Sequence, residues 1–174
     1  MVLCNQVNRQ RDVKRKINVG DEIMKICFVS SSGGHWEELM CLKALSNEHD
    51  AFYVTEAGGQ ADSCNLDKLY TFPQINRHER GFASHFMQLF FRARKILQTE
   101  KPDMVITTGA LLAFPFCLLG KMIGAKIVYV ESFARVHSRS LTGRLVYPFA
   151  DLFLVQWETM LELYPKAKFV GGIF

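Results

Sequence analysis

Short apolar, β-prone runs alternate with helix-like segments along most of this 174-residue chain. Because strands that alternate with helices form parallel βαβ units, the sequence predicts an α/β fold with a doubly wound, mostly parallel sheet. We expect seven strands, at residues 24–29, 51–55, 68–72, 103–107, 126–130, 152–155 and 168–170. Helices are expected between them, at residues 35–45, 82–97, 111–123, 140–147 and 158–163.

Length and composition indicate one domain, at residues 24–174, preceded by a basic flexible tail at residues 1–23. The net charge of +4 is modest and does not indicate a nucleic-acid partner. The five cysteines form no Cys-x-x-Cys pair, so we expect neither a disulfide framework nor a metal site, and nothing indicates a cofactor. No apolar run has the form of a signal peptide or approaches the roughly 20 residues that span a bilayer.

A turn of small residues, Ser30–His35, joins the first strand to the first helix. Backbone N–H groups at such a helix start favour an anion, and paired glycines let a phosphate come close. The same residues also suit a tight turn that binds no ligand. The Gly-x-Gly-x-x-Gly, P-loop and Gly-x-Ser-x-Gly patterns are absent, which argues against a dinucleotide enzyme, a P-loop NTPase and a serine hydrolase.

Three further loops should meet this turn at the carboxyl ends of the strands, where ligands bind in open parallel sheets. They are residues 77–80, 108–109 and 131–137. His35 has a side chain suited to a general base or a phosphate contact, or it only hydrogen-bonds locally. Glu131 either orients a sugar hydroxyl or forms an ion pair with Arg135 or Arg139.

The long helix at residues 82–97 carries two apolar faces. One stripe should face the core and consists of Phe82, Phe86, Leu89, Phe90, Ala93 and Leu97. Away from that stripe lie Met87 and Phe91, with Arg94 and Lys95 nearby. Apolar side chains flanked by basic groups suit contact with an anionic membrane surface. The alternative is a broad buried face beside a solvated charge cluster.

These motifs together resemble the PssD-like polysaccharide biosynthesis proteins. Those proteins are bacterial relatives of the membrane-docking subunit of a two-chain N-acetylglucosaminyltransferase. The resemblance runs from residue 24 to residue 174. It rests on the order of residues 29–35, 106–109, 126–135, 140–144, 147–151 and 155–158.

The resemblance implies the Rossmann-like acceptor half of a split glycosyltransferase of the GT-B type, similar to MurG cut in two. A partner chain would bind the UDP-sugar, and this chain alone would be inactive. The acceptor would be a lipid-diphosphate-linked saccharide of capsule or exopolysaccharide synthesis. Attachment would be peripheral, at the cytoplasmic face of the membrane, because the eukaryotic subunit's N-terminal anchor is lacking.

By the same resemblance, two residues would be catalytic: His35 and Glu131. The acceptor diphosphate would bind Ser31, Ser32, Gly33, Gly34, Thr108, Gly109 and Ser132. The exposed end of the last strand and the apolar tail would contact the partner through Gly172, Ile173 and Phe174. Two alternatives remain: a non-catalytic recruiter of a partner glycosyltransferase, and a free-standing nucleotide-binding α/β protein.

Overall fold

The computed structural model describes residues 22–58, 66–74 and 81–173. The predictions for the basic tail, for the loop at residues 77–80 and for Phe174 therefore lie outside the described residues, apart from positions 22 and 23 of the tail.

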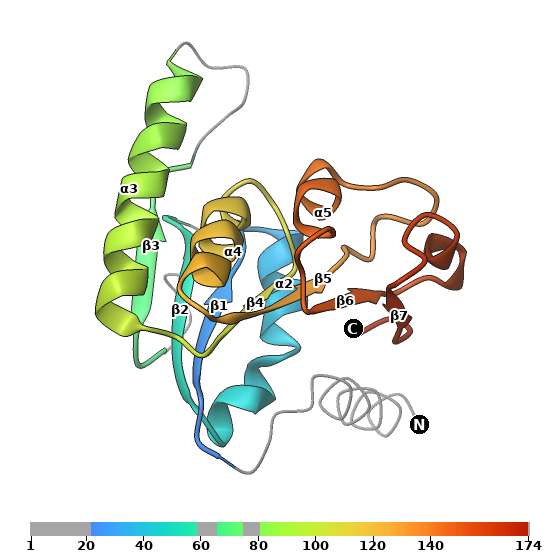
Figure 1. Cartoon of the computed structure of the whole chain (residues 1–174), viewed down its shortest axis with the longest axis horizontal. Coiled ribbons are helices and arrows are strands. Elements are labelled where there is room, and N and C mark those ends of the chain that lie inside the picture. Colours follow the sequence, from blue (N-terminus) through green and yellow to red (C-terminus); the bar gives the residue numbers. More distant parts are fainter. Residues whose placement is uncertain (1–21, 59–65, 75–80, 174) are drawn as a thin grey trace.

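The described chain forms one seven-stranded sheet in which every neighbouring pair is parallel (Figure 1). The strand order is β3-β2-β1-β4-β5-β6-β7. This confirms the predicted fold class. The strands are β1 (Lys25–Val29), β2 (Asp50–Glu56), β3 (Leu69–Phe72), β4 (Met104–Thr107), β5 (Lys126–Val130), β6 (Leu152–Val155) and β7 (Lys168–Phe169).

Helices cover both faces of the sheet (Figure 1). They are α2 (Gly34–Met40), α3 (Phe82–Glu100), α4 (Ala113–Met122) and α5 (Leu141–Val146), with short 3₁₀ helices η1 (Lys43–Asn47) and η3 (Glu158–Leu161). One hydrophobic cluster joins the sheet to α3, α4 and α5. A second cluster joins the opposite face to α2 and η1. The central strands are buried on both sides, which explains their continuous apolar sequences.

Two predicted helices differ from the structure in type, one in its second half and one throughout. The first α-helix ends at Met40 instead of residue 45, and the chain continues as the 3₁₀ helix η1. There the Ser46 hydroxyl donates to the Lys43 carbonyl, a local bond that competes with α-helical pairing. The segment after β6 is likewise a 3₁₀ helix, shorter than predicted.

The order of the strands fixes where a ligand site is expected. From β1, the strands β2 and β3 are added successively on one side. The chain then returns through α3, and β4 pairs with the other side of β1. A crevice forms at such a reversal, beyond the carboxyl ends of the two central strands. The turn after β1 and the loop after β4 therefore border the same place.

Candidate functional site

The glycine turn after β1 is open to solvent, since Gly33 and Gly34 are both exposed. Gly33 has a φ of 80°, which favours glycine, and its carbonyl accepts the first helical N–H groups, from Trp36 and Glu37. A Cβ added at Gly33 or at Gly34 would meet no heavy atom within 4 Å. The backbone of the turn is therefore accessible to a ligand.

Ser32, in the same turn, already has a partner. Its backbone N–H and its hydroxyl both donate to Glu56 Oε2, at 3.3 and 3.1 Å. Glu56 ends β2 and is almost fully buried. Sequence reasoning missed Glu56, because only the pairing of β1 with β2 brings it beside the turn.

His35 and Thr108 join the glycine turn to the loop after β4. His35 Nδ1 lies 2.9 Å from the Thr108 carbonyl oxygen, and Thr108 Oγ1 donates to the His35 carbonyl at 2.7 Å. Because a carbonyl only accepts hydrogen bonds, Nδ1 carries the proton in the neutral ring and Nε2 keeps a lone pair. Two predicted site segments are thus brought together.

The environment of the half-buried His35 imidazole favours its neutral form. Burial lowers the pKa of His35 below its ordinary 6.5, and the nearby positive charge of Arg135 acts in the same direction. The Thr108 carbonyl and the negative charge of Glu131 oppose them only in part. The ring is therefore mostly neutral at pH 7, and its Nε2 can accept a proton.

Gly109 follows Thr108 and leaves no room for a larger residue. Its φ is 106°, and an added Cβ would lie 2.7 Å from the Tyr129 hydroxyl and 3.6 Å from His35 Cε1. Its N–H donates to Thr107 Oγ1 at 2.9 Å. The close approach of the loop to His35 thus depends on glycine at this position.

Glu131 directly follows β5 and is a buried carboxylate whose oxygens both have partners. Oε2 accepts from the hydroxyls of Ser140 and Tyr164, at 3.1 and 2.9 Å, and Oε1 accepts from the Ser132 N–H at 3.2 Å. The predicted ion pairs with Arg135 or Arg139 are not found among the described residues. Glu131 instead fixes Ser140, the residue that caps the start of α5.

Glu38, one helical turn after His35, is a site residue that sequence reasoning missed. Its Oε1 accepts from the Ser132 hydroxyl at 3.0 Å and from the Phe133 N–H at 2.9 Å. Burial, only partly offset by these two bonds, raises the pKa of Glu38 to about 7. The sequence signal for this residue is an acidic side chain beside the apolar stripe of α2.

The residues predicted to contact a membrane do lie away from the core. Met87 and Phe91 are 56% and 65% exposed, and Arg94 and Lys95 are exposed beside them. Within the predicted core stripe, Leu89, Ala93 and Leu97 are buried, whereas the three phenylalanines are only half-buried. The reason is that the first half of α3 extends past the end of the sheet (Figure 1).

The predicted partner surface is only partly exposed. The Ile173 side chain is 1% exposed, and its N–H donates to Gln156 Oε1 at 3.0 Å. The prediction of an exposed apolar tail is therefore wrong at Ile173, because its side chain completes the core beneath α2. Phe169 of the edge strand β7 is 39% exposed, and Gly172 is half-buried.

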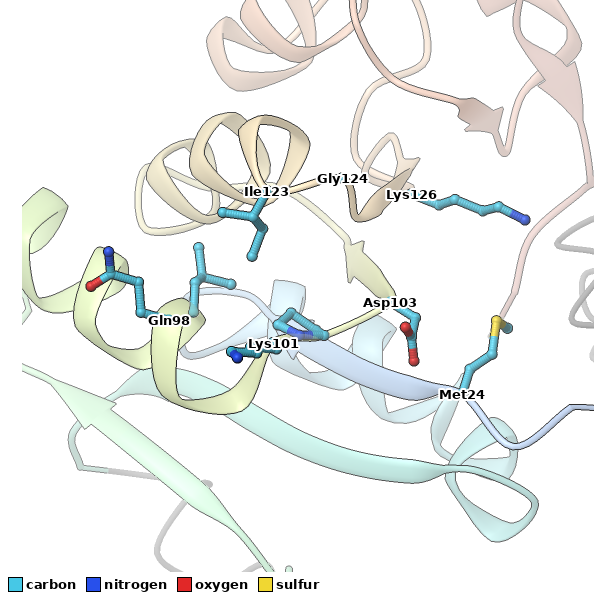
Figure 2. A pocket seen from close by; sticks show the side chains of 9 residues that line it. Met24, Gln98, Lys101, Asp103, Ile123, Gly124 and Lys126 are labelled. Atoms are coloured by element: carbon cyan, nitrogen blue, oxygen red, sulfur yellow. The ribbon is translucent and has the colours of Figure 1, made fainter.

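A pocket of about 680 Å³ lies at the opposite, amino end of the strands (Figure 2). The ends of α3 and α4 and the starts of β1 and β5 surround it, through residues that include Gln98, Lys101, Asp103, Ile123 and Lys126. Asp103 Oδ2 there accepts the N–H of Lys25 at 2.7 Å. None of the predicted site residues lines this pocket.

Two features are absent from the part of the chain that the structure describes. No helix there is long and apolar enough to cross a bilayer. No group of three or more histidine, cysteine, aspartate or glutamate side chains there is placed to hold a metal ion.

Residues 84–173, which run from α3 past β7, match the family described as oligosaccharide biosynthesis protein Alg14 like. The chain belongs to the Alg14-like family. The match includes Thr108, Glu131 and Arg135 and begins after the glycine turn. The curated relatives of the chain are eukaryotic, and the specifically bacterial, PssD-like part of the resemblance is not shown by them.

Curated relatives of the chain carry the name UDP-N-acetylglucosamine transferase subunit ALG14, among them a mouse and a human protein. The mouse protein is 28% identical over 87% of this chain and 84% of its own length. The human protein is 29% identical with the same coverage. Both similarities extend well beyond the segment that defines the family.

Among solved structures, MurG of Acinetobacter baumannii superposes with a TM-score of 0.62 at 14% sequence identity. The match covers 77% of this chain but 41% of the MurG chain. At this identity the likeness shows a shared fold, and the chain spans less than half of that protein.

Proposed function

We propose that this chain is the acceptor-binding subunit of a split glycosyltransferase that moves a sugar from a UDP-sugar to a lipid-diphosphate-linked saccharide. Family membership and the names of the relatives support the reaction class. The word subunit in the names of these relatives is consistent with a chain that needs a second polypeptide for its donor site.

The observation that carries this proposal is the pairing of His35 with Thr108. It holds the imidazole at the reversal point of the sheet, with Nε2 available as a base. In the proposed reaction the acceptor hydroxyl oxygen bonds to the sugar carbon, the bond from that carbon to UDP breaks, and His35 Nε2 takes the hydroxyl proton. The open turn at Gly33 and Gly34, with Thr108 and Gly109 beside it, would bind the acceptor diphosphate.

The remaining residues would assist without touching the sugar. Glu131 would act as a positioning residue, since its carboxylate is buried and bonded to Ser140 and Tyr164. Ser31 and Ser132 would border the diphosphate. Met87 and Phe91, with Arg94 and Lys95, would rest α3 on the membrane that holds the lipid acceptor. The edge strand β7 and Gly172 would lie toward the partner.

The test is sugar transfer by this chain, a candidate UDP-sugar-binding partner and a lipid-linked acceptor. Transfer should require both chains, because catalysis needs donor and acceptor held together. Equal transfer by this chain alone would contradict a split enzyme. The acceptor's origin in capsule or exopolysaccharide synthesis is a narrower proposal, tested by comparing lipid-linked acceptors from those sources.

His35→Ala separates this proposal from a purely recruiting role. In a catalytic half the variant should still bind its partner and lose turnover. A recruiter would retain both. His85, which is exposed on α3, supplies the matched control His85→Ala.

A further inference from the structure

The loop after β5 is held firmly at the same edge of the sheet as His35. Glu38 accepts hydrogen bonds from the start of this loop, at Ser132 and Phe133. On the other side, Trp157 Nε1 donates to the Phe133 carbonyl at 2.6 Å. The Arg135 N–H closes a turn by donating to the Ser132 carbonyl at 2.9 Å. The backbone of Arg135 is therefore fixed relative to α2.

The side chain of Arg135 forms no ion pair with a carboxylate of the described residues. It is exposed, and within the described residues its guanidinium makes one long hydrogen bond, from NH1 to Ser138 Oγ at 3.4 Å, and pairs with no carboxylate. Its charge nevertheless acts on His35. Two lysines of the fold, by contrast, pair with carboxylates: Lys68 with Glu100, and Lys121 with Asp151.

Of the arginines near the site, Arg135 acts on His35, whereas Arg139 and Arg144 act on Tyr164, the partner of Glu131. Three carboxylates, from Glu38, Glu56 and Glu131, surround the loops, and Glu56 already accepts both donors of Ser32. The turn at Gly33 and Gly34 offers backbone N–H groups alone. A diphosphate group placed beside His35 therefore needs a cation, and a planar guanidinium suits phosphate oxygens because it binds two of them at once.

We infer that Arg135 binds the diphosphate of the lipid-linked acceptor, on the side of the site opposite the glycine turn. This inference rests on the proposed function and adds a residue that sequence reasoning considered only as an ion-pair partner of Glu131. The loop that carries Arg135 would thus bring the acceptor's charged group next to His35. The reacting hydroxyl would then lie within reach of Nε2.

The test measures binding of a short-chain prenyl diphosphate N-acetylglucosamine to the full chain. Arg135→Ala should raise Kd about 10- to 100-fold, as expected for loss of a charge-assisted hydrogen-bonded pair. Arg135→Lys should recover part of the affinity, since a lysine keeps the charge but not the paired geometry. Lys126→Ala is the matched control, because it removes one positive charge at the amino end of the sheet.

Two outcomes would overturn the inference. One is an unchanged Kd for Arg135→Ala when the wild-type chain binds the probe. The other is an equal loss of binding to anionic phospholipid vesicles that contain no diphosphate lipid, which would assign Arg135 to membrane headgroups. If the wild-type chain fails to bind the probe at all, the acceptor-binding role itself fails. Equal thermal midpoints for variant and wild type would show that folding is not the cause.

Discussion

His35 and Thr108 form two hydrogen bonds with each other, one through the imidazole ring and one through the threonine hydroxyl. The two residues are far apart in the chain: His35 lies in the first turn of α2, and Thr108 lies in the loop after β4. Each segment supplies the acceptor for the other's donor, so neither moves independently. This pair holds the two central loops of the site at a fixed separation.

Replacing His35 with alanine should reduce kcat about 10²- to 10⁴-fold in the two-chain enzyme, the usual contribution of a general base. Because the pKa of His35 is lowered from 6.5, the acid limb of the wild-type pH–rate profile should lie below that value. Steady-state kinetics across pH 5 to 8 measures both effects. An unaltered profile in the variant would contradict proton transfer by this ring.

Gly109→Ala should destabilise the fold by about 1–3 kcal/mol, because alanine is strained at a φ of 106° and its Cβ would contact the Tyr129 hydroxyl. Chemical denaturation measures this free energy of unfolding. Gly34→Ala is the companion variant, since its Cβ would meet no atom within 4 Å. It should unfold like the wild type, and a comparable loss of stability would count against the described turn.

The pair Met87→Ala and Phe91→Ala should weaken binding to anionic vesicles at least tenfold, because each exposed side chain would bury apolar area in the membrane. Adding salt should weaken the wild type as well, through the screened charges of Arg94 and Lys95. Vesicle co-sedimentation measures both. Met122→Ala, which alters a 75% exposed methionine at the end of α4, should have no effect.

Glu38 should make the protein less stable as the pH rises from 5 to 8. Its pKa of about 7 in the folded state lies above the ordinary 4.5, so the folded state binds more protons than the unfolded chain between these values. The stabilisation present below pH 4.5 is therefore lost as the pH rises through about 7. Glu38→Gln keeps an acceptor for Ser132 and Phe133 and should flatten this dependence in thermal unfolding curves.

Glu100 should have the opposite pH dependence. Burial raises the pKa of Glu100. Hydrogen bonds from Lys25, Lys68 and Tyr70, with the charge of Lys25, outweigh burial and hold the pKa at about 2. Its contribution to stability is present above pH 4.5 and is lost as the pH falls toward 2. Glu100→Gln should lower the free energy of unfolding at pH 7 by about 1–3 kcal/mol. Asp50→Asn, at a 60% exposed carboxylate, should change it little.

The alternation of apolar runs with helical segments was enough to predict the sheet. Buried parallel strands have continuous apolar sequences, which can be recognised without knowing which strands pair. The bounds of β5 and β6 follow directly from such runs. The switch from α2 to η1 was not predictable in this way. It depends on a local hydrogen bond from Ser46, which sequence periodicity does not report.

The candidate site was predictable where it depends on backbone conformation and not where it depends on long-range pairs. Gly33 and Gly109 both have positive φ, and both glycines were identified from the sequence. Glu56 and Glu38 were missed, since each acts on a loop that is distant in sequence. Ile173 was misplaced for a similar reason: the core space that it fills exists only after α2 has packed on the sheet.

The side-chain amide of Gln156, just after β6, hydrogen-bonds to two segments that are distant in the sequence. Its Nε2 donates to the Glu131 carbonyl at 3.1 Å, while its Oε1 accepts the Ile173 N–H. The first residue of the site loop and the last described residue of the chain thus hydrogen-bond to the same side chain. A protein that binds this terminal segment would therefore also affect, through Gln156, the loop that carries Arg135. Partner binding and substrate positioning would then be coupled.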